Sequence, residues 1–443
     1  MLIITRQFYL FSGFHSLLIG LLPFFLPVLL WKQGASLAVI SAFIALTGVG
    51  YIITLWCWDR LRYQQRWRMV FMLSFIIELL LVGTLTFADS SLYLIGLALI
   101  NGAYNCFYWS TQRAMFSDIT SQENSGKTFG NFQILVVILL KLGILLGAYL
   151  IENQSTNAIL LCSFMTASIA LALLLPNLPA SNLLALNKIS NSVYTGEASS
   201  QPKRSYSALS VKQVKNFKDS NQSKLTFLLD GPFLFLESYF WVLSLYFLSN
   251  QNVLELGIII VSLTLLLSIL FYFIKAKIDQ ANTQKVFSLA VCLYALSWIL
   301  RAQFDASSHE FLLYATIILI AFLTAFFRLA FNKRFFDVSR SNKPHSYIVL
   351  KSYYSQLGII LFFGASALLL AMIDGLNIEQ FLTAFYWFAG PFAFLYGLYA
   401  RKLFTVSQND KAITPNQFLT HSRTTSRSSS TEQHIKGQQV NFL

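Results

Sequence analysis

The chain has 443 residues, of which 56% are hydrophobic and only 12% are charged, and its mean hydropathy is +0.59. Soluble domains carry about 25% charged residues, so this composition excludes a soluble enzyme, a disordered protein and a disulfide scaffold. It leaves a polytopic membrane protein. The formal net charge of +13 must be located along the chain before it can indicate any partner.

Twelve apolar runs follow one another along the chain, each close to the roughly 20 residues that a helix needs to cross a bilayer. They predict an all-α membrane protein with twelve transmembrane helices. The predicted spans are 8–31, 36–58, 69–87, 92–112, 129–151, 158–176, 225–249, 256–274, 287–304, 311–331, 346–372 and 380–400.

The basic residues indicate the orientation of these spans. With a cytoplasmic N-terminus, 27 of the 32 Lys and Arg residues fall on the cytoplasmic side, while the outside loops hold Lys32 and seven acidic residues. Cytoplasmic loops of membrane proteins are enriched in Lys and Arg. We therefore expect both termini in the cytoplasm, a bacterial inner membrane, and a basic excess that faces anionic lipid rather than nucleic acid.

Two polar stretches separate the predicted domains. Residues 177–224 form a linker rich in Ser, Asn and Lys, and residues 403–443 form a polar tail. Both stretches have too little apolar content for a core, which predicts disorder. The chain then divides into an N-terminal six-helix half, 1–176, and a C-terminal six-helix half, 225–402.

An internal repeat supports this division. Ser12-Gly13 recurs as Asp230-Gly231 after 218 residues, and Phe116-Ser117-Asp118 recurs as Phe335-Phe336-Asp337 after 219 residues. Two landmarks with nearly one offset indicate a parallel duplication of six helices. Transporters built from such repeats place their site near the middle of the membrane, between the repeats.

The loop between the second and third spans carries a recognisable motif. It reads Asp59-Arg60-Leu61-Arg62, followed by Arg66-Trp67-Arg68, and it resembles the loop signature of the major facilitator superfamily. The resemblance implies two six-helix halves, alternating access, and a cytoplasmic gate. The implied gating residues are Asp59, Arg60, Arg66 and Arg68, with Arg113 and Asp230 close to the same end. The alternative is that these charges only mark the topology.

Ionisable residues inside the spans are candidate functional residues, because a charge in hydrocarbon is costly. Lys141, near the middle of the fifth span, is expected to face an aqueous cavity or to pair with an acid. Glu237, at mid-depth in the seventh span, is a candidate for proton coupling or a fixed partner of Lys141 or Arg328. His15 can titrate near neutral pH, although a packing role is the alternative. Glu78 is expected to be structural.

The fourth span carries a polar stripe at helical spacing, which is unusual for a lipid-facing helix. In the family this span lines the central cavity, so the stripe is the predicted substrate contact. Arg328 in the tenth span corresponds to the position of Trp109 in the repeat, and the eleventh span adds two residues on one face. The predicted substrate-binding residues are Asn101, Asn105, Trp109, Gln112, Lys141, Arg328, Lys351 and Tyr354.

These features favour secondary transport of a small anionic or zwitterionic solute, because cations outnumber acids among the candidate residues. Protons are the candidate coupling ion. The fifth span has no Pro, unlike the antiporter signature of the major facilitator superfamily, so the resemblance implies symport or uniport rather than antiport. Transport of a lipid or other amphiphile, and a non-transporting sensor or assembly role, are the alternatives. The four scattered cysteines show no metal spacing. We expect no cofactor, no metal, no enzymatic activity and a monomer.

Overall fold

The computed structural model describes residues 2–86, 91–119, 125–176, 214, 217, 222–280, 283–303, 310–341, 344–373 and 378–400. All of these lie in one compact unit, Met1–Ala400, and the second unit, Arg401–Leu443, lies outside the described residues. Within the described residues the regular secondary structure is helical throughout. The predicted tail and almost all of the predicted linker, 177–224, also lie outside them.

The helices before the linker will be called the N-terminal set. They are α1 (Leu2–Leu21), η1 (Pro23–Phe25), α2 (Leu26–Lys32), α3 (Leu37–Tyr63), α4 (Trp67–Thr86), α5 (Ser91–Ile119), α6 (Ser125–Glu152) and α7 (Thr156–Leu174).

The helices after the linker will be called the C-terminal set. They are α10 (Ser223–Phe235), the π-helix η2 (Leu236–Phe240), α11 (Trp241–Leu248), α12 (Val253–Gln280), α13 (Thr283–Ala302), α14 (Glu310–Ser341), α15 (Pro344–Ala371), α16 (Ile378–Ala393) and η3 (Phe394–Ala400).

Nine helical segments among the described residues are long and apolar enough to cross a membrane, and a tenth forms if α1 and α2 are joined across their 45° bend. The bend lies at Pro23, which starts η1 and cannot continue the hydrogen bonding of α1. Helix α5, which carries the polar stripe, and the apolar segment Val253–Leu267 of α12 are the predicted spans that fall outside these ten.

Close helix packing on glycine occurs in both sets, and one helix pair from each set shows it. Gly143 in α6 lies against the backbone carbonyl of Leu17 in α1, and Gly358 in α15 lies against that of Leu228 in α10. A Cβ atom at either glycine would overlap that oxygen. Pro232 follows Leu228 by four residues and has no N–H to bond it, so the Leu228 carbonyl is free to face α15. Both packings depend on glycine.

The predicted landmarks of the repeat occupy comparable places in the two sets. Gly13 in α1 faces Leu139 of α6, and Gly231 in α10 faces the Ser355 carbonyl of α15. Each glycine therefore lies where the first long helix of its set packs on the fifth. Phe116 of α5 and Phe336 of α14 face each other, with ring centroids 4.6 Å apart.

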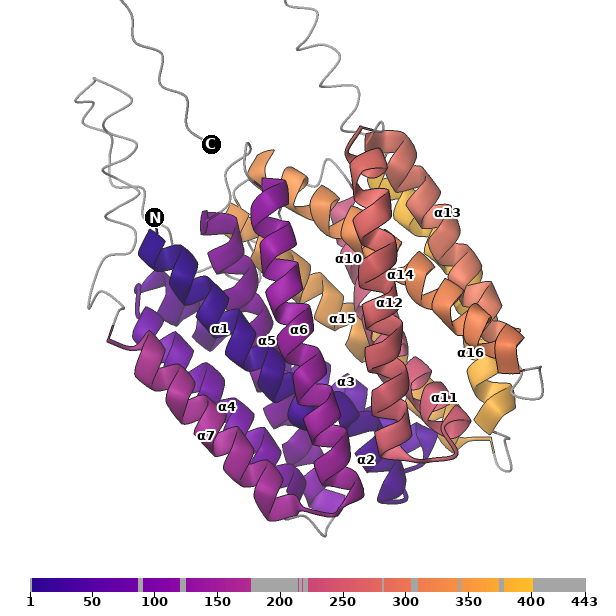
Figure 1. The fold of residues 1–443 in the computed structure, drawn as a ribbon, viewed down its shortest axis with the longest axis horizontal. Coiled ribbons are helices and arrows are strands. Elements are labelled where there is room, and N and C mark those ends of the chain that lie inside the picture. Colours follow the sequence, from indigo (N-terminus) through magenta and orange to yellow (C-terminus); the bar gives the residue numbers. More distant parts are fainter. Residues whose placement is uncertain are drawn as a thin grey trace, which may run out of the picture. The chain divides into compact units, whose positions relative to one another are not determined.

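The two sets touch at both ends of the helices as well as between them. At one end, called the α2–α11 end, Trp31 packs on Phe247 with ring centroids 5.3 Å apart. At the other, called the α5–α14 end, Phe116 packs on Phe336, and His345 Nε2 lies 3.4 Å from Asp118 Oδ1. Between the ends, α3 packs on α15, and α6 lies beside α12 (Figure 1).

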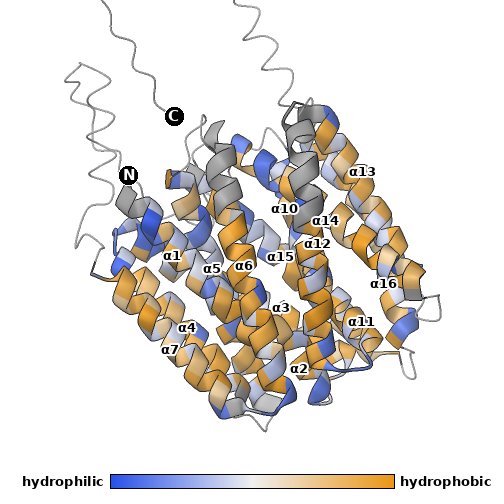
Figure 2. Cartoon of the chain, viewed as in Figure 1, coloured by the Kyte–Doolittle hydropathy of each residue, from blue (hydrophilic) through white to orange (hydrophobic). Residues whose placement is uncertain are grey.

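The outward surfaces of the helices are apolar. Figure 2 shows hydrophobic residues covering much of α4, α6, α7 and α12, with hydrophilic residues concentrated toward helix ends. Large exposed apolar side chains include Ile76, Leu142, Phe164 and Leu265. In a soluble protein such a surface would aggregate. In hydrocarbon it is the expected boundary.

Candidate functional site

The largest group of buried charges lies in the C-terminal set and is organised by Arg328 of α14. Its Nη1 donates to Asp230 Oδ1 over 2.6 Å, and its Nε donates to Glu237 Oε2 over 3.0 Å. One guanidinium thus holds two carboxylates from the seventh predicted span, Asp230 in α10 and Glu237 in η2. Charge-assisted bonds of this kind are stronger than neutral ones.

Lys351 of α15 completes the group from the opposite side. Its Nζ lies 3.3 Å from Asp230 Oδ2, and it lies over the rings of Phe331 and Phe335 at 4.8 and 4.6 Å. Asp230 therefore faces two cations, and its side chain is only 1% exposed. The four charged residues Asp230, Glu237, Arg328 and Lys351 will be called the charged cluster.

Two tyrosines hold the carboxylates of the charged cluster in place. Tyr294 of α13 donates to Glu237 Oε1 over 2.5 Å, and Tyr396 of η3 donates to Asp230 Oδ1 over 3.1 Å. Tyr294 also stacks on Phe327, with ring centroids 3.9 Å apart. Glu237 thus receives bonds from Arg328 and from Tyr294, which fixes it as a fully satisfied carboxylate.

The predicted stripe on α5 forms a chain of hydrogen bonds. Trp109 Nε1 donates to Asn105 Oδ1 over 3.1 Å, and Asn105 Nδ2 donates to the Asn101 carbonyl over 2.8 Å. Asn101 Nδ2 in turn donates to Tyr239 Oη of η2 and to Thr47 Oγ1 of α3, both over 3.2 Å. The stripe therefore ends on the π-helix that carries Glu237.

A second polar contact joins the two sets beside the charged cluster. Tyr51 of α3 is bonded to Ser110 of α5 over 2.9 Å and donates to Ser352 of α15 over 3.2 Å. Ser352 follows Lys351 directly in the chain. Arg113 of α5 lies within electrostatic range of Lys351 and makes no hydrogen bond or ion pair with a described residue. The stripe thus bonds Tyr239, two residues from Glu237 in the chain, and Tyr51 bonds Ser352, the neighbour of Lys351.

The N-terminal set has its own buried polar group, formed by His15 and Glu78. His15 Nδ1 lies 2.5 Å from Glu78 Oε2, and Ser74 Oγ lies 2.9 Å from His15 Nε2. Both side chains are fully buried. The imidazole stacks on Phe75, with centroids 4.0 Å apart. The sequence placed His15 and Glu78 in different spans without relating them, and the structure makes them partners.

Three of the predicted substrate-binding residues lie apart from the rest. Gln112 is buried against Tyr108, to whose Oη it donates over 3.0 Å. Tyr354 lies beside Lys224, whose Nζ is 5.9 Å from the ring centroid, rather than beside Lys351. Lys141 is half-buried in α6, with no hydrogen bond or ion pair to a described residue. Its suggested pairing with an acid is not found among the described residues.

The family signature has an acid–base pair that Asp59 and Arg60 match, but the structure pairs Asp59 with a different arginine. Asp59 is buried and pairs with Arg62 Nη2 over 2.6 Å, whereas Arg60 is exposed and lies over Trp56. Arg66 and Arg68 are exposed at the start of α4. The i,i+3 spacing of Asp59 and Arg62 places both on one helical face, which adjacent residues cannot share.

Sequence reasoning missed the tyrosines and one arginine. Tyr51, Tyr239, Tyr294 and Tyr396 each bond a residue of the stripe, the charged cluster or Ser352. Arg301 is buried between Trp241 and Trp298, with its carbon Cζ 5.0 and 4.6 Å from the two ring centroids. The chain has 20 Tyr, and nothing in their local sequence distinguishes these four.

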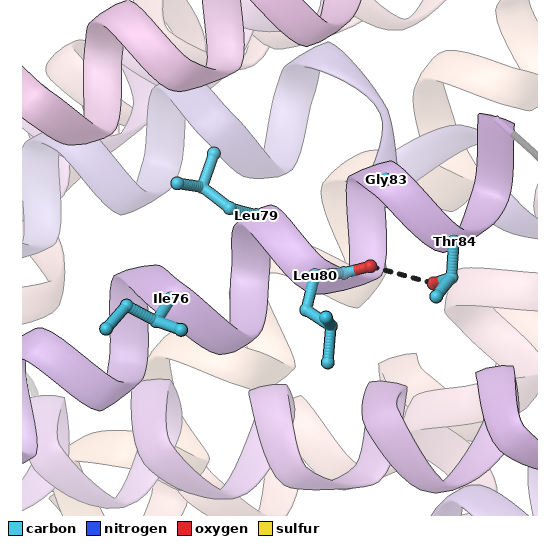
Figure 3. A pocket seen from close by; sticks show the side chains of 5 residues that line it. All are labelled: Ile76, Leu79, Leu80, Gly83 and Thr84. Carbon is cyan, nitrogen blue, oxygen red and sulfur yellow. Dashed lines mark hydrogen bonds between the residues drawn. The ribbon is translucent and has the colours of Figure 1, made fainter.

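A hollow of about 450 Å³ lies on the outward face of α4 (Figure 3). Its lining residues are Ile76, Leu79, Leu80, Gly83 and Thr84, and the Thr84 hydroxyl is bonded to the Leu80 carbonyl of its own helix. It contains no charged group and belongs to a single helix. It has the character of a lipid-facing groove and shares no residue with the stripe or the charged cluster.

Comparisons with known proteins agree with this architecture. The family model described as Major Facilitator Superfamily matches residues 8–254, which is more than half of the chain. No curated protein is similar enough in sequence to count as a relative. Among the described residues, no group of His, Cys, Asp and Glu is arranged to hold a metal ion.

Several solved structures share the fold. The nucleoside transporter NupG has 14% identity and a TM-score of 0.59, covering 90% of this chain and 99% of that one. A D-xylose-proton symporter has 12% identity and a TM-score of 0.60, covering 90% and 96%. The human organic anion transporter MFSD10 has 17% identity and a TM-score of 0.56, covering 90% and 99%. These likenesses and the apolar helices make the chain an integral multi-pass membrane protein.

Proposed function

Because this chain belongs to the Major Facilitator Superfamily, we propose that it is a secondary transporter of a small anionic or zwitterionic organic solute. Transport proceeds by alternating access, in which the N-terminal and C-terminal sets rock about a central site. The solute binds between the α5 stripe and the charged cluster. The protein acts as a monomer, without cofactor, in a bacterial inner membrane.

The membrane topology belongs to the same proposal. Twelve helices cross the membrane, α5 and α12 among them, in two halves bounded by 1–176 and 225–402. Both termini, the linker and the tail face the cytoplasm, as the distribution of basic residues favours. The α5–α14 end is then the cytoplasmic end, and the gate there consists of the Asp59–Arg62 pair, the exposed Arg60, Arg66 and Arg68, and the contacts of Phe116 and Asp118.

The observation that carries the proposal is the double engagement of Asp230. Its carboxylate is held by Arg328 at 2.6 Å and by Lys351 at 3.3 Å, in the set that the α5 stripe contacts. A solute carboxylate or phosphate can replace Asp230 as the partner of Lys351, while Arg328 still neutralises Asp230. Such an exchange of partners gives the solute a binding site without leaving a buried charge unpaired, which would be costly.

The balance of charge selects the sign of the solute. Arg113, Arg301, Arg328 and Lys351 bring four positive charges to this region, and Asp230 and Glu237 bring two negative ones. A negative charge on the solute reduces this positive excess in a medium where net charge is unfavourable. The amides of Asn101 and Asn105 and the indole of Trp109 supply polar contacts and stacking for the rest of the molecule.

Coupling to protons is the second element of the proposal. The sequence offers Glu237 and His15 as carriers inside predicted spans; His15 is fully buried and the side chain of Glu237 is 14% exposed. Their surroundings differ: Glu237 accepts bonds from Arg328 and Tyr294, whereas His15 shares a contact of 2.5 Å with Glu78.

A thermal-unfolding screen of the purified protein tests the proposal. Small anions, zwitterions, cations, sugars and lipids are compared, because a ligand that binds only the native state must raise the unfolding temperature. The decisive variant is Lys351→Met, which leaves Asp230 paired with Arg328. The matched control is Lys333→Met, which removes an exposed lysine from α14.

Stabilisation by one class of anion or zwitterion, lost in Lys351→Met and kept in Lys333→Met, is the expected result. Stabilisation by cations alone would contradict the argument from charge. A response to lipids alone would favour the amphiphile alternative. No response from any solute, combined with no uptake into proteoliposomes, would favour a sensor or assembly role.

A further inference from the structure

We infer that the buried pair His15–Glu78 is a proton-binding site, and that this pair, rather than Glu237, carries the coupling proton. The inference rests on the proposed transport function and assigns its proton site to the N-terminal set. Glu78 becomes a functional residue, although its position in a peripheral span had indicated a structural role.

The geometry of the pair requires a bound proton. His15 Nδ1 and Glu78 Oε2 are 2.5 Å apart, a distance at which an unprotonated nitrogen and a carboxylate would repel each other. One proton therefore lies between them, and the pair is electrically neutral when Nε2 carries a second proton; loss of one of these two protons leaves the pair with one negative charge. At the other side of the ring, Ser74 Oγ is 2.9 Å from Nε2, and a hydroxyl can donate or accept there. The ring can thus change its protonation without losing its partner.

The surroundings of the pair favour retention of this proton while both ends of the transporter are closed. Both side chains are fully buried. The groups that face Glu78 are the neutral hydroxyls of Tyr104 and Tyr108 from α5. Described residues of α7 include no charged side chain, and Lys141 of α6 bonds no described residue. Loss of the proton would leave a buried anion without a cation.

Glu237 is less able to gain and lose a proton. Arg328 and Tyr294 donate to its two oxygens, and Arg301 lies within electrostatic range of it. A proton on Glu237 would have to displace bonds from a guanidinium. The charged cluster is therefore suited to exchange a solute anion, and the His15–Glu78 pair to exchange a proton.

The position of His15 connects the pair with the rest of the molecule. Helix α1 continues through the bend at Pro23 into α2, and α2 contacts both α11 and the π-helix η2 that carries Glu237. Hydration of the pair requires α1 and α4 to separate, and a shift of α1 moves α2 against the C-terminal set. Release of the proton is thereby linked to opening of one end of the transporter.

Distances between spin labels test the inference without any substrate. In a background where the four native cysteines are replaced, one label pair at Gln33 and Asn250 reports the α2–α11 end, and another at Ser117 and Lys333 reports the α5–α14 end. We expect the fraction of molecules with both ends closed to fall as the pH rises from about 5 to about 8, the range in which histidine titrates. The response should disappear in Glu78→Gln.

Three further variants make the result specific. His15→Phe combined with Glu78→Leu removes the proton site without leaving a lone buried charge, and it should also lose the response. Glu237→Gln should keep it. Asp118→Asn combined with His345→Gln removes the His–carboxylate pair of the proposed gate at the α5–α14 end; it should loosen that end at every pH and keep the pH response at the α2–α11 end.

A wild-type protein whose distances ignore pH would overturn the inference, as would a response that survives in both Glu78 variants. A response lost in Glu237→Gln but kept in Glu78→Gln would return the proton to Glu237. None of these outcomes bears on whether a solute anion binds at Lys351, so the proposed transport function stands or falls separately.

Discussion

The two sets of helices place aromatic rings in similar positions but surround them with different polar groups. Phe75 and Tyr294 are related by the repeat offset of 219, as are Tyr108 and Phe327. In the N-terminal set, the ring of Phe75 stacks on His15, whose partner is a single acid. In the C-terminal set, Tyr294 stacks on Phe327 and serves a cluster of four charges. The comparison indicates that one scaffold supports a fully buried His–Glu pair on one side and a cluster of four charged residues on the other.

The largest expected effect on the free energy of unfolding comes from the loss of Arg328, because that residue bonds two carboxylates at once. Arg328→Met should lower the free energy of unfolding by about 3–5 kcal/mol, the range for breaking a buried ion pair from one side. Denaturant titration in detergent measures it. The control is Arg60→Met, which removes an exposed arginine and should have little effect. An Arg328→Met protein as stable as the wild type would contradict the assigned ion pairs.

Removal of Glu78 alone should also lower the free energy of unfolding, but by less than the loss of Arg328. Glu78→Leu leaves His15 with Ser74 as its remaining partner, and an unsatisfied buried polar group costs about 1–3 kcal/mol. The double variant His15→Phe with Glu78→Leu should recover much of this loss, because an apolar pair needs no partner. Equal stability of the single and double variants would show that the two residues do not interact.

The closely packed glycines provide a test of whether the sets follow the same packing rule. Gly143→Ala and Gly358→Ala should each destabilise by about 1–3 kcal/mol, since the new methyl group meets a backbone carbonyl. Gly364→Ala is the matched control, because nothing lies within 4 Å of its added Cβ. It should be neutral or stabilising by up to about 1 kcal/mol. Different responses at Gly143 and Gly358 would break the symmetry between the two packings.

Loss of the Tyr51 hydroxyl, which joins the two sets, should lower the free energy of unfolding by a smaller amount. Tyr51→Phe removes bonds to Ser110 and Ser352 while it keeps the ring, and a net loss of about 0.5–1.5 kcal/mol is expected. Because Ser352 belongs to the C-terminal set, the variant should also weaken the closed state. The spin-label pair at the α5–α14 end would detect a broader distance distribution, and an unchanged distribution would exclude Tyr51 from closure.

The smallest expected effect on stability distinguishes Arg60 from Arg62 in the loop motif. Arg62→Ala should cost about 0.2–1 kcal/mol, as measured for partly exposed ion pairs, because Arg62 bonds Asp59. Arg60→Ala should cost less, because Arg60 lies over Trp56 on the exposed side. A larger loss of stability in Arg60→Ala would restore the pairing that the motif suggested.

Much of the architecture could be predicted from hydropathy and charge, because hydrocarbon imposes long apolar helices on any chain that crosses it. The family resemblance was confirmed by the family model. Among the described residues, nine of the predicted spans satisfy length and hydropathy, or ten if α1 and α2 are joined. Gln112 and Tyr354 show that helical periodicity does not predict which residues become neighbours in a site. Residues that share a helical face can still have different neighbours, since the neighbours come from distant helices.

The partners of the buried charges could not be predicted for the same reason. Arg328 and Asp230 are 98 positions apart, and His15 and Glu78 are 63 apart. Sequence marks such residues as costly in a membrane but does not say which of them meet. The tyrosines were invisible because a phenol is common in apolar spans, and only its hydrogen bond distinguishes a structural role.

The most direct test of the account is the affinity of the ligand that the stability screen identifies, measured by titration calorimetry. We expect Lys351→Met to weaken binding at least about tenfold, which corresponds to about 1.4 kcal/mol. The His15→Phe/Glu78→Leu variant should bind at the wild-type affinity at a fixed pH. Full affinity in Lys351→Met, together with loss of binding in the N-terminal variant, would contradict the assignment of the solute to the charged cluster.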